Sequence, residues 1–330
     1  MREELIEKIK KVSPDTFDEL ALEVFRYQAT CNELYARFLE LLKVDPLNIR
    51  HIKNIPCLPI GFFKTFDIQC GEWLPEQIFT SSGTTGQQSS RHLVRNLDWY
   101  KAIALRGFEQ FYGPIGNYCV LALLPSYLER SGSSLVFMAD DFIRRSEHTR
   151  SGFYLYDLSA LADAIKACQA EGTPVLLLGV SFALWDLAVQ FPMPLDGVIV
   201  METGGMKGRK RELTRDELHL VFKNAFHIET VHSEYGMTEL LSQAYSQGKG
   251  LFYPSHTMRV FTRDVSDPLS PQQHGKTGVI NVIDLANIDS ISFIATEDLG
   301  KTYADGSFEV LGRLDASDLR GCNLMVAGQA

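Results

Sequence analysis

Apolar runs of strand length alternate with helix-length segments between residues 119 and 233. The apolar runs are Val120–Leu124, Val175–Leu178, Val198–Met201 and Ile228–His232. Strands that are apolar on both faces need helices on both sides, as in largely parallel α/β sheets. The helices expected between the later runs are Asp157–Ala170, Phe182–Gln190 and Thr214–Asn224. The pattern predicts an α/β fold, with mainly parallel strands flanked by helices.

The segments on either side of this region have different patterns. Ser13-Pro14-Asp15 is typical of a helix N-cap followed by a proline in the first turn. Apolar residues then recur at helical spacing from Phe17 to Leu42, which predicts one long amphipathic helix. After about residue 255, short strand signals broken by turns predict a smaller β-rich lobe. We therefore expect an α/β region at 1–254 and a β-rich lobe at 255–330, ending in a short cysteine-bearing tail.

The net charge and the hydropathy of the chain argue against some classes of binding partner and some cellular locations. The formal net charge of −9 argues against nucleic acid and anionic membrane surfaces, because binding to phosphates requires a basic face. No apolar run approaches the roughly 20 residues of a membrane span. The charged start of the chain also lacks the apolar stretch of a signal peptide. These features predict a cytoplasmic protein.

The cysteines show neither a C-x-x-C pair nor the cysteine and histidine spacing of a zinc site. Most of them lie in apolar runs, which favours buried, reduced thiols. The cysteine near the C-terminus lies instead in a glycine-preceded, polar-flanked segment, Arg320-Gly321-Cys322-Asn323. The other cysteines, each expected to be a structural thiol, are Cys31, Cys57, Cys70, Cys119 and Cys168.

A loop of hydroxyls and glycines runs Ser81-Ser82-Gly83-Thr84-Thr85-Gly86. Glycine accepts the backbone angles at which successive N–H groups face an anion. The loop is not a Walker P-loop, because no lysine follows Gly86. Taken alone, the segment fits an ordinary turn slightly better than a phosphate site.

A second segment, Tyr235-Gly236-Met237-Thr238-Glu239, follows an expected strand. It brings together an aromatic ring for stacking, a hydroxyl for a phosphoryl oxygen and a carboxylate suited to Mg²⁺. A helix start would contain similar residues, since threonine and glutamate favour that position. Its place after a strand end favours a binding role, because ligands of open α/β sheets bind there. Gly204-Gly205 follows another such strand.

A third segment contains Asp298, Asp305-Gly306 and Gly312-Arg313. A carboxylate can accept both hydroxyls of a ribose, and a guanidinium can reach ribose or phosphate oxygens. A β-hairpin with a surface ion pair explains the same residues, so this segment alone does not distinguish a nucleotide-binding site from an ordinary hairpin.

In their order along the chain, these three segments resemble core motifs of the adenylate-forming enzymes, the superfamily of acyl-CoA synthetases and adenylation domains. Three ordered motifs are far more specific than any one of them. The resemblance implies ATP and Mg²⁺ as cofactors. It implies that the residues from Ser81 to Gly86 hold the pyrophosphate moiety, and that Tyr235, Gly236 and the Gly204-Gly205 loop lie beside adenine. Thr238 would contact the α-phosphate, Glu239 would bind Mg²⁺, and Asp298 with Arg313 would bind the ribose.

Two departures separate this chain from full-length relatives. The loop after Gly86 lacks the usual proline and lysine, so Arg91 replaces them or nothing does. The chain ends at Ala330, so we expect no C-terminal lid domain and no lysine from it. The short LuxE-type acyl-protein synthetases are similar in this respect and carry an acyl-accepting cysteine near the C-terminus, where this chain has Cys322.

The resemblance implies an AMP-forming ligase that activates a fatty or other carboxylic acid and passes the acyl group to a thiol, Cys322. The implied partners are the acid and an acyl reductase or another acyl-accepting protein. Two alternatives stay open. One is an acyl-CoA ligase of the phenylacetate-activating type, and the other is a non-catalytic nucleotide-binding protein.

Overall fold

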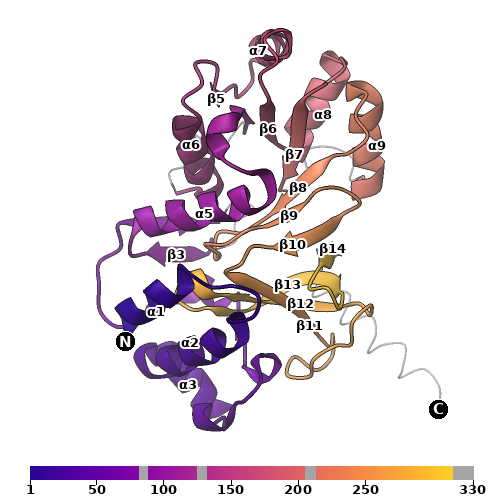
Figure 1. Cartoon of the computed structure of the whole chain (residues 1–330). Coiled ribbons are helices and arrows are strands. Elements are labelled where there is room, and N and C mark those ends of the chain that lie inside the picture. Colours follow the sequence, from indigo (N-terminus) through magenta and orange to yellow (C-terminus); the bar gives the residue numbers. More distant parts are fainter. Residues whose placement is uncertain (82–87, 125–131, 205–212, 315–330) are drawn as a thin grey trace, which may run out of the picture.

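The computed structural model describes residues 1–81, 88–124, 132–204 and 213–314. Helices form at the N-terminus and then between the strands of a large sheet (Figure 1). The described α-helices are α1 (Arg2–Ile9), α2 (Phe17–Cys31), α3 (Glu33–Leu41), α4 (Phe62–Thr65), α5 (Leu97–Tyr112), α6 (Ser134–Ser146), α7 (Leu158–Ala170), α8 (Ser181–Gln190) and α9 (Arg215–Phe226). The described 3-10 helices are η1 (Pro46–Asn48), η2 (Ile52–Asn54), η3 (Ile115–Asn117) and η4 (Leu285–Asn287).

The strands form one 12-stranded mixed sheet and one two-stranded antiparallel sheet. The large sheet has the order β11-β12-β13-β14-β10-β9-β8-β7-β6-β4-β5, and β1 pairs with β13 beside this path. Strands β4 to β8 pair in parallel, and so do β1 and β13, while the other pairings of β9 to β14 are antiparallel. The strands of the large sheet are β1 (Leu58–Pro59), β4 (Cys119–Leu123), β5 (Gly152–Phe153), β6 (Val175–Val180), β7 (Val198–Thr203), β8 (His232–Tyr235), β9 (Ala244–Ser246), β10 (Leu251–Pro254), β11 (Met258–Arg263), β12 (Gly278–Asp284), β13 (Phe293–Thr302) and β14 (Phe308–Arg313). The small sheet pairs β2 (Gln77–Thr80) with β3 (Arg91–Val94).

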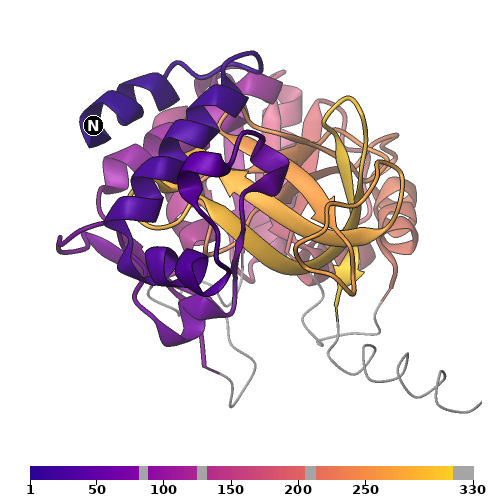
Figure 2. The same cartoon turned by 90° about the horizontal axis from the view of Figure 1, so that it is seen from below.

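Two hydrophobic cores stabilise these layers. The first lies around strands β4, β6 and β7, which α5 and α6 cover on one side and α8 and α9 on the other (Figure 1). The second packs α1, α2 and α3 against β11, β12 and β13. Figure 2 shows these N-terminal helices lying over one face of the orange strands. The first and last parts of the described chain therefore share a core, and a division near residue 254 stays a prediction.

The predicted fold class is confirmed, because a parallel strand region flanked by helices is joined to an antiparallel one. The predicted helices lie within a few residues of α7, α8 and α9. Asp305-Gly306 forms the turn between β13 and β14, with φ +85° at Gly306. The expected strand at Ile228–His232 was placed too early, since β8 begins only at His232. None of the described helices combines the length and apolar character needed to cross a membrane.

The prediction of one long N-terminal helix was wrong. Helix α2 ends at Cys31, and Asn32 takes an extended conformation before α3 begins. The Asn32 side chain accepts the Tyr35 N–H at 2.9 Å, which caps α3 in the way that asparagine favours. Periodicity did not reveal the break, because α2 and α3 bury apolar residues in the same core. Ser13 is also not the N-cap of α2, which is Thr16.

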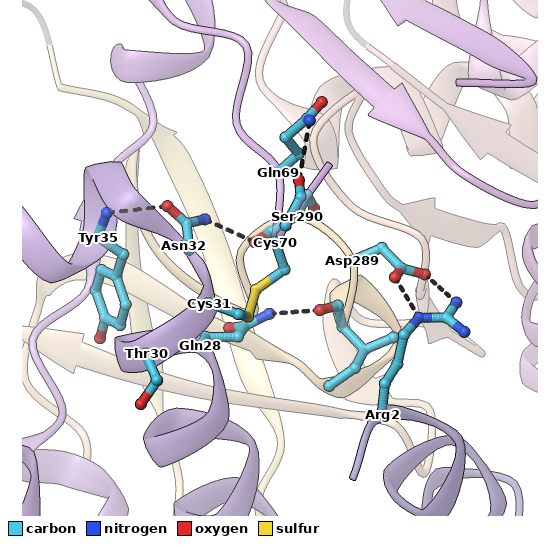
Figure 3. The surroundings of a disulfide bond; sticks show 12 residues. Arg2, Gln28, Thr30, Cys31, Asn32, Tyr35, Gln69, Cys70, Asp289 and Ser290 are labelled. Carbon is cyan, nitrogen blue, oxygen red and sulfur yellow. Dashed lines mark hydrogen bonds and ion pairs between the residues drawn. A yellow bond between two sulfur atoms is a disulfide. The ribbon is translucent and has the colours of Figure 1, made fainter. Parts of the chain in front are cut away.

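The prediction that every cysteine outside the C-terminal tail is a reduced thiol was wrong for one pair. Cys31 and Cys70 form a disulfide that joins the end of α2 to the segment after α4 (Figure 3). The backbone N–H of Gly71 also donates to the Cys31 carbonyl at 2.9 Å. The two cysteines are 39 residues apart, so no local spacing in the sequence indicated that they form a disulfide. Cys57, Cys119 and Cys168 are buried and free, as expected.

Candidate functional site

A cavity of about 460 Å³ lies where the parallel strands end and the antiparallel strands begin. Segments far apart in the sequence contribute to it: the chain around β2 and β3, the start of α6, the ends of β7 and β8, and strands β13 and β14. Of the residues predicted from the sequence, those that line it are Ser81, Gly204, Gly236, Thr238, Glu239, Asp298 and Arg313. The structure therefore brings parts of all three motifs to one place.

The remaining predicted residues either lie outside the described part of the chain or do not line the cavity. Ser82, Gly83, Thr84, Thr85, Gly86, Gly205 and Cys322 lie outside the described residues. Tyr235 is described but does not line the cavity. Its ring lies edge-on to Phe252 and Phe308, with centroid distances of 6.0 and 5.4 Å. Its placement beside adenine stays a prediction.

Tyr235 instead supports the acidic side chain of the third motif. Its hydroxyl donates to Oδ2 of Asp298 at 2.8 Å. Asp298 is the cross-strand partner of Arg313, and the Arg313 Nε lies 3.8 Å from the other carboxylate oxygen. Burial raises the pKa of Asp298, while the Tyr235 hydrogen bond and the Arg313 charge oppose the rise. The Arg313 side chain is 73% exposed, so its guanidinium has room to reach a ligand.

The chain at Thr238 and Glu239 is held by side chains that the sequence did not single out. Nδ1 of His92, in β3, lies 2.8 Å from the Thr238 carbonyl. The Asn287 side chain, in η4, donates to the Glu239 carbonyl at 2.8 Å. Burial lowers the pKa of His92 to about 4, so its imidazole is neutral at physiological pH. These bonds fix the backbone from which the Thr238 and Glu239 side chains extend.

Glu239 is a buried carboxylate that faces the cavity. Its exposed fraction is 5%, and burial raises its pKa, with hydrogen bonding from Ser90 and the charge of Arg313 opposing this. Ser90 is held in turn, because its N–H donates to the Ser81 hydroxyl at 2.9 Å. The site therefore contains a buried carboxyl group whose ionised form is incompletely compensated by its neighbours, and a bound cation would stabilise that form.

Two further carboxyl groups lie at the ends of β7 and β8. Glu202 accepts the Ser181 hydroxyl at 2.5 Å and lies 3.5 Å from His219 of α9. Burial alone would raise the pKa of Glu202, but the nearby His219 and the hydrogen bond from Ser181 bring it below its ordinary value. Glu234 accepts a hydrogen bond from Thr203, and burial raises its pKa. Its carboxylate lies against Gly236, where a Cβ would come within 2.4 Å of Oε1, so a side chain at that position would have to displace the carboxylate.

A larger groove, of about 560 Å³, lies between the start of α7 and helix α8. It contains none of the residues of the three motifs, although Phe182, which we expected from its place after a strand end to line the acid pocket, contributes to it. The smaller cavity is therefore the candidate functional site. Its further lining residues include Lys64, Tyr100, Ser133, Leu135, Met138 and Glu234. Lys64 lies in the proline-containing segment before the first motif, which also resembles the LuxE-type sequences, and the fold brings it to the cavity.

Neither protein-family models nor curated protein sequences match this chain. Solved structures do. ATP-bound MatB from Rhodopseudomonas palustris matches with a TM-score of 0.55 and 17% identity, over 73% of this chain and 49% of that one. The 2-hydroxyisobutyryl-CoA ligase in complex with 2-HIB-AMP and CoA matches with a TM-score of 0.65 and 12% identity, over 92% of this chain and 69% of that one. The chain thus spans about half the length of MatB. These similarities confirm the fold.

The carboxyl group of Glu234 generates a prediction for the free energy of unfolding. Burial raises the pKa of Glu234 from 4.5 to about 7. Between these values the folded state binds more protons than the unfolded state, so stability falls as pH rises through this window. A rise from 4.5 to about 7 corresponds to about 3 kcal/mol. Glu234→Gln should therefore unfold at higher denaturant concentration than wild type at pH 8, and much less so at pH 4.

The measurement is urea unfolding at intervals from pH 4 to pH 8. Glu229→Gln is the matched control, because Glu229 is exposed and precedes the same strand. The control should keep the wild-type dependence on pH. An unchanged dependence in Glu234→Gln would show that this carboxyl group has the same pKa in the folded and unfolded states.

Proposed function

We propose that this protein activates a carboxylic acid with ATP, forming an acyl-adenylate and releasing pyrophosphate, and then transfers the acyl group to a thiol. The observation that carries the proposal is the convergence of three motifs on one cavity. Ser81, Thr238 and Asp298 come from separate parts of the chain, yet all line it. The cavity lies beyond the ends of parallel strands, where ligands of α/β sheets bind. The fold shared with acyl-CoA ligases supports the same activity.

In the proposed first step, a carboxylate oxygen of the acid attacks the α-phosphorus. A bond forms between them, and the bond from this phosphorus to the bridging oxygen breaks, so that pyrophosphate leaves with the electron pair. Thr238 would donate a hydrogen bond to the α-phosphate as negative charge develops there. Asp298, positioned by Tyr235, would accept the ribose hydroxyls. Leu135 and Met138 supply apolar surface for the chain of a fatty acid.

The donor set fits a hard divalent cation. Glu239 is buried, faces the cavity and has a raised pKa. Its carboxylate would hold Mg²⁺, which supplies neutralising charge at the phosphates when bound. The cations among the described lining residues are Lys64, next to the buried Phe63 of α4, and Arg313 of β14. We propose that Lys64 contributes a positive charge to the phosphates from the N-terminal part of the chain.

The thiol acceptor distinguishes two versions of the proposal. In the first, Cys322 attacks the acyl carbon, AMP leaves, and a thioester on the protein passes the acyl group to a reductase or another accepting protein. In the second, coenzyme A is the acceptor. The second is favoured by the structural neighbour whose complex contains 2-HIB-AMP and CoA. The LuxE-type resemblance and the polar surroundings of Cys322 favour the first.

Thr238→Ala and Glu239→Gln should each slow acid-dependent exchange between pyrophosphate and ATP. Each removes a group that stabilises charge at the α-phosphate, and losing one such group costs on the order of 3 kcal/mol, roughly a hundredfold in rate. Glu229→Gln, an exposed glutamate, should exchange at the wild-type rate. Wild-type exchange in both site variants would exclude this cavity as the place of adenylation.

Lys64→Ala should reduce the same exchange rate by about a hundredfold if its charge stabilises the transition state. Lys64→Arg should retain part of the rate, because it keeps a charge at that position. Lys53→Ala changes an exposed lysine on the preceding segment and should have no effect. If only the KM for ATP rises in Lys64→Ala, then Lys64 contributes to ground-state binding.

Incubation with ATP, Mg²⁺ and labelled acid, without coenzyme A, should leave a label on the protein that hydroxylamine removes. Cys322→Ser should abolish this thioester and leave pyrophosphate exchange intact, because the two steps use different groups. Cys57→Ser, which changes a buried cysteine, is the control and should still be labelled. Label that appears only on added coenzyme A would favour the CoA ligase.

A further inference from the structure

Two cysteines and a histidine from separate elements meet at the other end of the parallel strands. Cys119 is the first residue of β4, Cys168 lies in the last turn of α7, and His148 follows α6. One ligand atom from each lies within 4.8 Å of those of the other two. The cavity described above lies beyond the opposite ends of these strands, so this cluster is separate from it.

The turn that carries His148 is fixed against β4. Helix α6 ends at Ser146, and the φ of +51° at the next residue, Glu147, reverses the chain. The Ser151 hydroxyl accepts the Val120 N–H at 2.9 Å and lies 3.8 Å from the Cys119 Sγ. It also accepts the Ser146 hydroxyl at 2.7 Å. The histidine and the first thiol are therefore held together by a hydrogen-bond network before any ion binds.

An ion pair fixes the same turn to the helix that carries the second thiol. Arg150 forms two hydrogen bonds with the carboxylate of Glu171, at 2.6 and 2.8 Å. Glu171 is the C-cap of α7, close to Cys168 in the chain. Such a bidentate pair fixes orientation as well as distance. The three candidate ligand residues are thus positioned by contacts of neighbouring residues, and not only by contacts of their own ligand atoms.

The chemistry of the three groups selects a class of metal ion. Two thiolates and an imidazole are soft or borderline ligands, which suit Zn²⁺ and do not suit Mg²⁺ or Ca²⁺. The backbone N–H of Arg150 donates to the Nδ1 of His148 at 3.2 Å, which helps to orient the imidazole ring. Metal–sulfur bonds of about 2.3 Å place tetrahedral ligands roughly 3.8 Å apart, so only a small contraction of the cluster is required.

Charge also balances in the bound state. A divalent ion with two thiolates is neutral, and Arg150 is already paired with Glu171. Thiols bind metal ions as thiolates, so metal binding releases their protons, and affinity should increase with pH.

We propose that Cys119, His148 and Cys168 bind Zn²⁺, with water as the fourth ligand on the side of the half-buried His148. The ion would join β4, α7 and the turn after α6, so its role would be to stabilise the parallel part of the sheet. The proposal does not depend on the function of the cavity.

The test uses the full chain, reduced and freed of metal with a chelator. Zn²⁺ is titrated against a chromophoric chelator, and Co²⁺ is added separately to observe its absorption. We expect one Zn²⁺ per chain, a thiolate-to-cobalt charge-transfer band, and a higher Tm with Zn²⁺. His148→Ala and Cys168→Ser should each weaken Zn²⁺ binding by at least about a hundredfold, since even changes outside the ligand shell cost ten- to a hundredfold.

Matched controls separate this site from other thiols and histidines. His51→Ala changes an exposed histidine and Cys57→Ser a buried free cysteine, and both should bind Zn²⁺ like wild type. Because His148 is only half-buried, its variant should fold even if Cys168→Ser does not. The proposal is overturned if the wild-type chain binds no stoichiometric Zn²⁺, or if folded His148→Ala binds it with wild-type affinity and the same cobalt band.

Discussion

A buried carboxylate, that of Asp284 at the end of β12, organises the chain behind the candidate site. It accepts the backbone N–H groups of Leu241 and Ser242 at 2.8 and 2.9 Å, and the Ser242 hydroxyl at 2.6 Å. Its burial raises its pKa, while these hydrogen bonds favour the ionised form. A buried charge is stable only when hydrogen bonds or an opposite charge compensate it. The positions of these donors relative to Asp284 are therefore strongly specified. The chain that follows Glu239 is thereby fixed to β12.

The N-terminal helices hold the other side of the same segment. Gln28 of α2 donates to the carbonyls of Asn287 and Ile288, and Asn32 donates to the Ser290 carbonyl. Arg2 pairs with Asp289, and the N–H of Cys70 donates to the Asp289 carbonyl beside the disulfide (Figure 3). Because Asn287 in turn holds the Glu239 backbone, α1 and α2 support the cavity without lining it.

This arrangement explains what the sequence could predict and what it could not. Strands and helices of the α/β region followed from periodicity, because each buries a face that its own residues specify. The motifs were identifiable because their residues are close in sequence. The roles of His92, Asn287 and Glu234, and the Cys31–Cys70 disulfide, depend on contacts between distant segments. Propensity and spacing contain no information about such contacts, and the break at Asn32 was hidden for the same reason.

The distribution of buried charge connects the fold to the proposed chemistry. Glu234, Glu239 and Asp298 all have pKa values raised by burial, and all line the cavity. Carboxyl groups in such surroundings reduce folding stability near neutral pH, whereas Glu202, paired with His219, does not have this raised pKa. A ligand that brings a divalent cation and ribose hydroxyls would satisfy Glu239 and Asp298 directly. The groups that reduce folding stability at this end of the sheet are therefore those best suited to bind a metal–nucleotide complex. Such a loss of stability in exchange for binding is expected of a functional site.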